Sequence, residues 1–222
     1  DSKKWARWHV KSNVKKLLQN PKLEGDQRSY IESLREEPIL NGNWYKRVHA
    51  PMPEGVLGLD VTPEYCSVPT EGIKFIKKFL SDPFIIYIVR DPVQRALSQV
   101  RMNMNRKNAD FSNPQAWLEA ASEPVISLRG DYRAYIPAWD EIFPNVLYIP
   151  FGEIAQDPIG LLRRIEKFCG LPAASYPRAH RAVFETVKRS APAEVMQYLA
   201  TELAGQTIFL KQRFSKEFCE QT

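Results

Sequence analysis

The sequence predicts an α/β fold with a parallel sheet, and three segments carry this prediction. Residues Phe84–Val89 form an apolar, β-branched run that is too short for a buried helix and is typical of a strand buried on both faces. Residues Val56–Val61 form a second apolar run of this kind. Between them, residues 70–80 place apolar side chains at helical spacing, with lysines on the other face. This order predicts a right-handed strand–helix–strand unit in which Phe84–Val89 is a central strand.

The region before these strands is predicted to be mainly helical. Residues 1–10 have helical character, and residues 12–38 form a polar helical region that a proline ends. Residues 41–47 are expected to form a turn followed by an aromatic pair, Trp44 and Tyr45, that packs under a loop.

The region after Val89 is predicted to alternate helices with one more strand. Helices are expected to begin at Pro92 and Pro114, because proline suits the first turn of a helix. The remaining elements are a helix that carries Trp139 and is closed by Phe143-Pro144, a strand at Val146–Ile149, a helix capped by Asp157, and a helical tail.

Length and composition fit one α/β domain that covers residues 1–222. The formal net charge of +5 favours an anionic ligand. The sequence has no zinc-ligand spacing, no RNA-binding aromatic signature and no basic block. It therefore gives no indication that nucleic acid is a partner. No apolar run is long enough for a membrane span. Three cysteines without a CxxC pair do not indicate a disulfide framework, so the cytoplasm is the expected compartment.

The most informative stretch is the turn that follows Phe84–Val89. A buried strand ends at Arg90, and Asp91-Pro92 then begins a helix. In α/β folds, anions bind where the carboxyl end of a strand meets a helix N-terminus. Arg90 is therefore a candidate anion ligand, and the Ser98 hydroxyl, two turns into the helix, could share the anion. The alternative is an arginine that pairs with Asp91 and a serine on a solvated face.

This stretch resembles the 3′-phosphate-binding motif of the PAPS-dependent sulfotransferases, in which an Arg at a strand end and a Ser in the next helix hold the cofactor. The resemblance places these roles on Arg90 and Ser98. Four more segments between about residues 40 and 175 are similar to heparan-sulfate-type and bacterial sulfotransferases, in the same order. They are Asn43–Lys46, Gly58–Tyr65, Gly130–Tyr132 with Trp139 and Phe143-Pro144, and Glu153 with Asp157-Pro158 and Phe168–Leu171.

The resemblance implies a P-loop-like, three-layer domain with a central parallel sheet flanked by helices. The family's N-terminal strand and 5′-phosphosulfate loop have no counterpart in the sequence and are expected to be missing from it. The implied reaction transfers the sulfuryl group of PAPS to a hydroxyl or amine of a small-molecule or glycan acceptor and releases PAP, with no metal. One departure concerns Val61, because heparan-type members carry a Lys at this position.

Two further groups of candidates follow from the sequence. Lys188 and Arg189 lie in a predicted loop and are candidates for binding the cofactor. His49, His9 and Glu64 are candidates for the general base, although a base upstream of the sequence is expected in their place.

Other classes of function remain open. One is a non-catalytic basic module that binds anionic glycans or nucleic acid, and another is a P-loop kinase, which the missing Gly-rich loop disfavours. The Golgi lumen replaces the cytoplasm as the expected compartment if the protein is eukaryotic.

Overall fold

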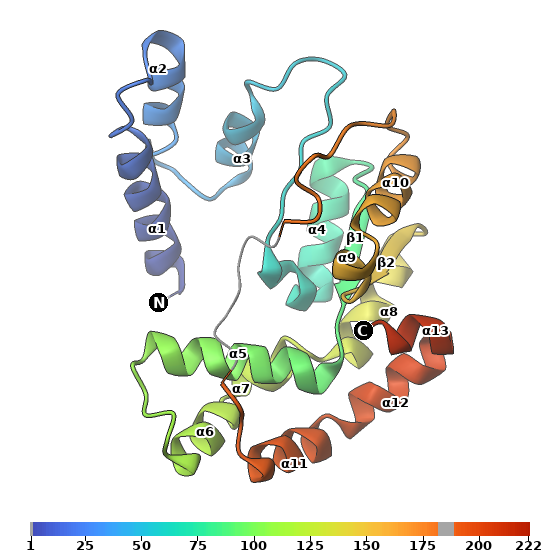
Figure 1. Ribbon diagram of the computed structural model, residues 1–222. Coiled ribbons are helices and arrows are strands. Elements are labelled where there is room, and N and C mark those ends of the chain that lie inside the picture. The colour runs from blue at the N-terminus through green and yellow to red at the C-terminus, as the bar shows by residue number, and fades with distance from the viewer. Residues whose placement is uncertain (1, 182–188) are drawn as a thin grey trace. The chain divides into compact units, whose positions relative to one another are not determined.

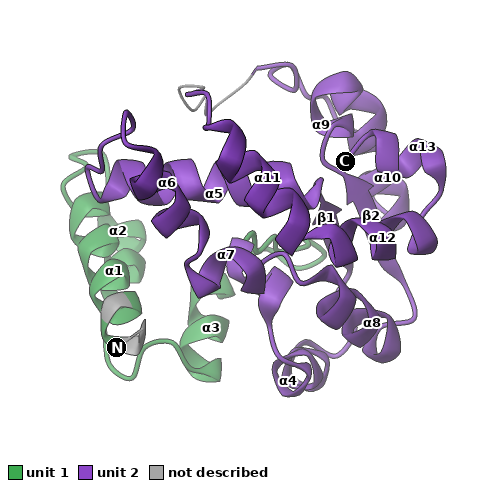
Figure 2. Ribbon diagram, turned by 90° about the horizontal axis from the view of Figure 1, so that it is seen from below, with its two compact units in different colours: residues 1–61 green, residues 62–222 purple. Residues whose placement is uncertain are grey.

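The computed structural model describes residues 2–181 and 189–222. The chain divides into two compact units, Asp1–Val61 (unit 1) and Thr62–Thr222 (unit 2), which are coloured separately in Figure 2. No helix in the described ranges is both long and apolar enough to cross a membrane.

The regular secondary structure described in unit 1 is helical, as predicted for the region before residue 39. It contains α1 (Ser2–Leu17), α2 (Gly25–Ser33) and α3 (Gly42–His49) (Figure 1). The prediction of a turn at residues 41–47 was wrong, because Asn41 is the N-cap of α3 and its side chain accepts a hydrogen bond from the Trp44 backbone N–H at 2.8 Å.

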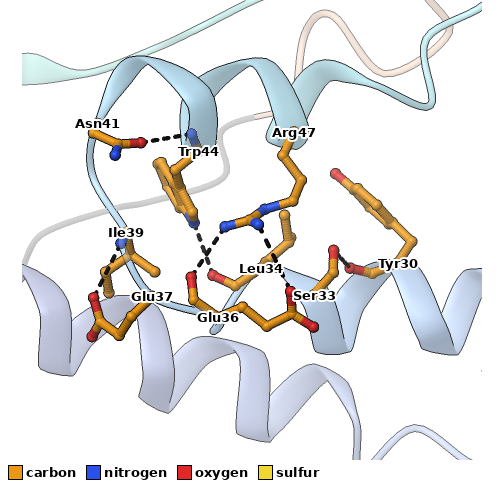
Figure 3. A network of polar contacts seen from close by, with 9 residues as sticks. All are labelled: Tyr30, Ser33, Leu34, Glu36, Glu37, Ile39, Asn41, Trp44 and Arg47. Carbon is orange, nitrogen blue, oxygen red and sulfur yellow. Dashed lines mark hydrogen bonds and ion pairs between the residues drawn. The ribbon is translucent and has the colours of Figure 1, made fainter.

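Polar contacts join α3 to the end of α2 (Figure 3). The Trp44 indole N–H donates to the Leu34 carbonyl at 2.8 Å, and the Arg47 guanidinium donates to the Glu36 carbonyl at 3.0 Å. Trp44 therefore has a structural role within unit 1, and its indole N–H satisfies a carbonyl that the end of α2 leaves without a helical partner.

The segment Val56–Val61 is not a strand, and this prediction was wrong. It has no regular secondary structure, and Leu59 and Val61 are 79% and 77% exposed. An apolar run forms a strand only where a neighbouring strand pairs with it and a packed surface covers one face. The sequence shows the hydrophobicity of the run but not the presence of that partner. The predicted strand–helix–strand unit through α4 (Thr70–Leu80) is therefore absent from the described residues, although α4 itself is confirmed.

Unit 2 contains a small parallel sheet, as the fold prediction requires. Strand β1 (Ile85–Val89) pairs with β2 (Val146–Pro150), and Tyr87 lies opposite Tyr148. In the described part of the chain the sheet has these two strands, so the prediction of a central strand buried on both faces was wrong. Tyr87 and Val89 are buried, whereas Ile88, which points to the opposite face, is 49% exposed. The three-layer, P-loop-like arrangement stays a prediction.

The other regular elements described in unit 2 are helices (Figure 1). Those predicted from residues 92, 114 and 158 and from the segment around Trp139 are confirmed, as is the helical tail. The elements are η1 (Pro63–Ser67), α4, α5 (Pro92–Arg106), α6 (Pro114–Ala121), α7 (Pro124–Leu128), α8 (Tyr132–Ile142), α9 (Glu153–Gln156), α10 (Pro158–Phe168), α11 (Ala193–Glu202), α12 (Ala204–Arg213) and α13 (Lys216–Glu220).

Two apolar clusters hold unit 2 together. The first packs the buried face of β1 against α4, α8 and α12, with Tyr87, Val89 and Tyr132 among its members. The second joins α5, α6, α7 and α11 around Trp117, which is fully buried. Because β1 belongs to the first cluster and α5 to the second, the turn between them at residues 90–91 lies where the two cores meet.

The exposure of Val56–Val61 gives a direct test within unit 1. Leu59→Ala is expected to change the free energy of unfolding by less than about 0.5 kcal/mol, as for other surface substitutions. Ile39→Ala is the matched control, because Ile39 is 2% exposed and its truncation should cost about 2–5 kcal/mol. Urea denaturation measures both, and a cost of Leu59→Ala equal to that of Ile39→Ala would show that the segment is a buried strand.

Candidate functional site

The candidate site begins at the turn that joins β1 to α5. Asp91 is the N-cap of α5, and its carboxylate accepts a hydrogen bond from the Gln94 backbone N–H at 2.8 Å. Pro92 follows at the first helical position, where its missing N–H costs nothing. Asp91 and Pro92 therefore end the strand and begin the helix directly after Arg90.

Tyr132 fixes the backbone of Arg90 from both sides. The Tyr132 hydroxyl accepts a hydrogen bond from the Arg90 N–H at 3.2 Å and donates one to the Arg90 carbonyl at 2.9 Å. Tyr132 is 2% exposed and is the first residue of α8. Its hydroxyl supplies the hydrogen bonds that a neighbouring strand would give at this position, so the end of β1 is held without a further strand.

The Arg90 side chain lies over an aromatic ring from the end of β2. Its guanidinium carbon is 4.5 Å from the centre of the Phe151 ring. Phe151 is itself held beside β1, because its backbone N–H donates to the Val89 carbonyl at 2.8 Å. A cation over an aromatic face contributes about 0.5–1 kcal/mol at exposed sites.

The electrostatics of Arg90 favour an anion. Within the described residues, its guanidinium forms no ion pair with a carboxylate. Partial burial lowers the pKa of Arg90, and the positive charge of Arg101 on α5 lowers it further. The nearby Asp91 carboxylate acts in the opposite direction. An anion bound here would offset the cost of burying this charge.

Helix α5 carries the other predicted ligand. Ser98 is half-buried in the second turn of α5, and Arg101 follows three residues later, on the same side of the helix. The grouping of Arg90 with Ser98 stays a prediction.

The backbone of Arg189 contacts α5, whereas its guanidinium lies over the Phe111 ring. The Arg101 Nε–H donates to the Arg189 backbone carbonyl at 2.8 Å. The cationic site is defined here as Arg90 together with Ser98 and Arg101 of α5. Lys188, the other predicted loop residue, lies outside the described residues. Sequence reasoning missed Arg101, although its position three residues after Ser98 on a helix was a usable signal.

A partly buried arginine, Arg95, supports the loop that precedes Tyr132 and α8. The Arg95 guanidinium donates to the Gln99 side chain at 2.8 Å and to the Ile126 carbonyl. It also lies directly against Gly130, where a Cβ atom would be 2.8 Å from Arg95 Nε. Glycine at this position therefore lets the loop before α8 approach α5 closely enough for Tyr132 to reach Arg90.

The candidates for the general base have other surroundings. The Glu64 carboxylate forms an ion pair with Arg129. His49 belongs to unit 1, where its ring lies 4.6 Å from that of Tyr45. His9 is on α1 of the same unit.

Comparison with known proteins identifies the family. A model of the sulfotransferase family matches residues 3–175. The chain belongs to this family. It is 30% identical over 173 residues to mouse heparan sulfate glucosamine 3-O-sulfotransferase 3A1 and 29% identical to mouse 3-O-sulfotransferase 3B1. Each comparison covers 67% of this chain and 44% of the relative, so the chain spans less than half the length of these enzymes. The prediction that the chain belongs to the sulfotransferase family is confirmed.

Tyr132→Phe tests the hydroxyl that holds the Arg90 backbone. The change leaves the ring in place and removes the partner of two backbone groups at a buried position. The free energy of unfolding should fall by about 1–3 kcal/mol, the cost of leaving such groups unsatisfied.

Tyr135→Phe is the matched control, since Tyr135 lies on the same helix and is only half-buried. It should change stability by less than about 0.5 kcal/mol. Equal effects of the two changes in urea denaturation would contradict the assignment to Tyr132.

Proposed function

We propose that this chain transfers the sulfuryl group of PAPS to a hydroxyl or amine acceptor and releases PAP. The observation that carries the proposal is Arg90, a half-buried guanidinium without a carboxylate partner in the described residues. It is located at the carboxyl end of a parallel strand, next to the N-terminus of α5. Membership of the sulfotransferase family supports the class of reaction.

The chemistry of Arg90 suits the 3′-phosphate of this nucleotide. A guanidinium presents N–H groups in a planar fork and binds two phosphate oxygens at once. Ser98 would add a neutral donor, and the N-terminus of α5 would contribute its partial positive charge. Arg101 would raise the positive potential further. Lys188 stays a predicted ligand.

The reaction itself requires positioning more than covalent catalysis. An acceptor oxygen or nitrogen attacks sulfur, and the bond from sulfur to the 5′-phosphate oxygen breaks, so that PAP leaves with the electron pair. A general base takes the acceptor proton. Holding the 3′-phosphate at the cationic site would fix the adenosine end of the donor and so help align sulfur with the acceptor. His49, Glu64 and His9 stay candidates for the base.

A glycan hydroxyl is the acceptor that the comparisons favour. The names of the most similar relatives specify heparan sulfate glucosamine as the group that those enzymes modify. The net charge of +5 suits an acidic glycan, which is the acceptor we propose. The compartment stays a prediction, with the Golgi lumen expected for a eukaryotic chain and the cytoplasm for a bacterial one.

Arg90→Ala tests the proposed nucleotide site. The change should weaken binding of PAP by about 1.5–3 kcal/mol, the scale of a hydrogen bond to a charged group. Arg106→Ala is the matched control, because Arg106 is exposed at the far end of α5. Isothermal titration calorimetry measures both affinities. Unchanged affinity in a folded Arg90→Ala variant would reject Arg90 as a ligand.

A non-catalytic basic module is the second candidate, and the net charge is the observation that favours it. Binding of heparan sulfate by such a module would weaken steeply with salt, and the module would ignore PAP. The proposed enzyme should instead show a higher melting temperature with PAP, because a ligand that binds the native state stabilises it. It should also transfer labelled sulfate from PAPS to desulfated heparan sulfate. Salt-sensitive glycan binding without stabilisation by PAP would favour the module.

A further inference from the structure

Gln206, on α12, forms two hydrogen bonds to the residues on either side of Tyr132. Its Nε2 donates to the Asp131 carboxylate at 2.8 Å, and its Oε1 accepts from the Arg133 backbone N–H at 3.0 Å. Asp131 and Arg133 are the neighbours of Tyr132 in the chain. One side chain of α12 therefore holds both neighbours of the tyrosine whose hydroxyl holds Arg90.

These contacts lie at the N-terminus of α8, where backbone N–H groups have no partner within the helix. Asp131 is the N-cap of α8, and its carboxylate also accepts a hydrogen bond from the Ala134 N–H at 3.3 Å. Gln206 provides an acceptor for a second N–H of this turn, that of Arg133. The first turn of α8 is therefore fixed jointly by its own cap and by α12.

The packing of α12 brings Gln206 to this place. A Cβ atom on Gly205 would be 2.9 Å from Arg133 Nη1, so the glycine leaves room for the start of α12 to lie close to α8. Further along α12, Leu210 is 3% exposed and belongs to the same apolar cluster as Tyr132. Gln206 is thus presented to α8 by a helix that the core of unit 2 holds in place.

Tyr132 connects this arrangement to Arg90. Its hydroxyl accepts from the Arg90 N–H at 3.2 Å and donates to the Arg90 carbonyl at 2.9 Å. The path from Gln206 to the Arg90 backbone therefore consists of hydrogen bonds and the chain itself. The match to the sulfotransferase family ends at residue 175, so it assigns no role to Gln206.

We propose that Gln206 is a positioning residue for the nucleotide site. It fixes the first turn of α8, so that the Tyr132 hydroxyl stays on the Arg90 backbone and Arg90 is held ready for the 3′-phosphate. The proposal rests on the proposed function. Without Gln206, a fraction of the molecules loses the contact between Tyr132 and Arg90. The apparent affinity for PAP then falls in proportion to the fraction that keeps this contact.

Gln206→Met tests the effect on affinity, because it keeps the length of the side chain and removes both hydrogen bonds. Calorimetry should show PAP binding about fivefold weaker than in the wild type, the factor that corresponds to one neutral hydrogen bond. Gln212→Met is the matched control, since Gln212 is exposed on the same helix, and it should bind PAP as the wild type does. Equal affinities of the two variants would overturn the proposal.

The same substitution in a Tyr132→Phe background tests whether Gln206 acts through the hydroxyl. The effect of Gln206→Met on PAP affinity should disappear there, because the hydroxyl that Gln206 positions is gone. A general structural role of Gln206 would reduce the affinity equally in both backgrounds. That result would contradict the role as a positioning residue.

Hydrogen exchange followed by NMR without nucleotide provides an independent readout. The Arg90 amide should exchange faster in Gln206→Met than in the wild type or in Gln212→Met, because it spends less time bonded to the Tyr132 hydroxyl. The amide of Val100, a buried residue in α5, is the reference for global unfolding. An unchanged rate at Arg90 relative to Val100 would overturn the proposal. If the wild-type chain binds no PAP, the proposed function fails, while the exchange at Arg90 still decides whether Gln206 holds Tyr132.

Discussion

The site depends on one hydroxyl that makes two hydrogen bonds. At the end of β1 the Arg90 N–H and carbonyl no longer take part in the ladder with β2, and Tyr132 receives one bond and donates the other. Backbone groups left without partners at such a position would be costly, so this contact holds the strand end in place. Arg95 and Gly130 support it, because they let the loop before α8 lie close to α5. The direction in which Arg90 leaves the sheet follows from these contacts.

A fixed backbone makes a concentration of positive charge possible. Arg90 and Arg101 are close enough for the charge of one to lower the pKa of the other, and Arg101 also holds Arg189. Like charges at short range oppose folding unless an anion or aromatic rings offset them. In unit 2 aromatic rings offset part of the cost of these charges, since Phe151 lies under Arg90 and Phe111 lies under Arg189. In the proposed function, the charge of a bound nucleotide would offset the remaining repulsion.

The sequence predicted the elements whose signals are local. Strands β1 and β2 follow from apolar runs, α4 from its periodicity, and α5 and α10 from an Asp-Pro pair that caps and begins each helix. Arg90 and Ser98 were predicted for the same reason, because both belong to one short motif. The exposure of residues 56–61 could not be predicted, since hydrophobicity alone does not show whether a neighbouring strand is present.

The remaining parts of the site depend on contacts between distant residues. Tyr132 lies 42 residues from Arg90, and Arg101 lies 88 residues from Arg189. No local pattern indicates such pairs. Tyr132 belongs to a segment that resembles the sulfotransferases, but the sequence indicated no role for its hydroxyl. Phe151 was missed because its position under Arg90 depends on how β2 pairs with β1.

A crystal structure of the chain with adenosine 3′,5′-bisphosphate tests the central claim most directly. The account predicts that the 3′-phosphate lies within hydrogen-bond distance of the Arg90 guanidinium and the Ser98 hydroxyl, while the Arg90 backbone keeps both bonds to Tyr132. A nucleotide bound elsewhere, with Arg90 turned away from it, would contradict the account.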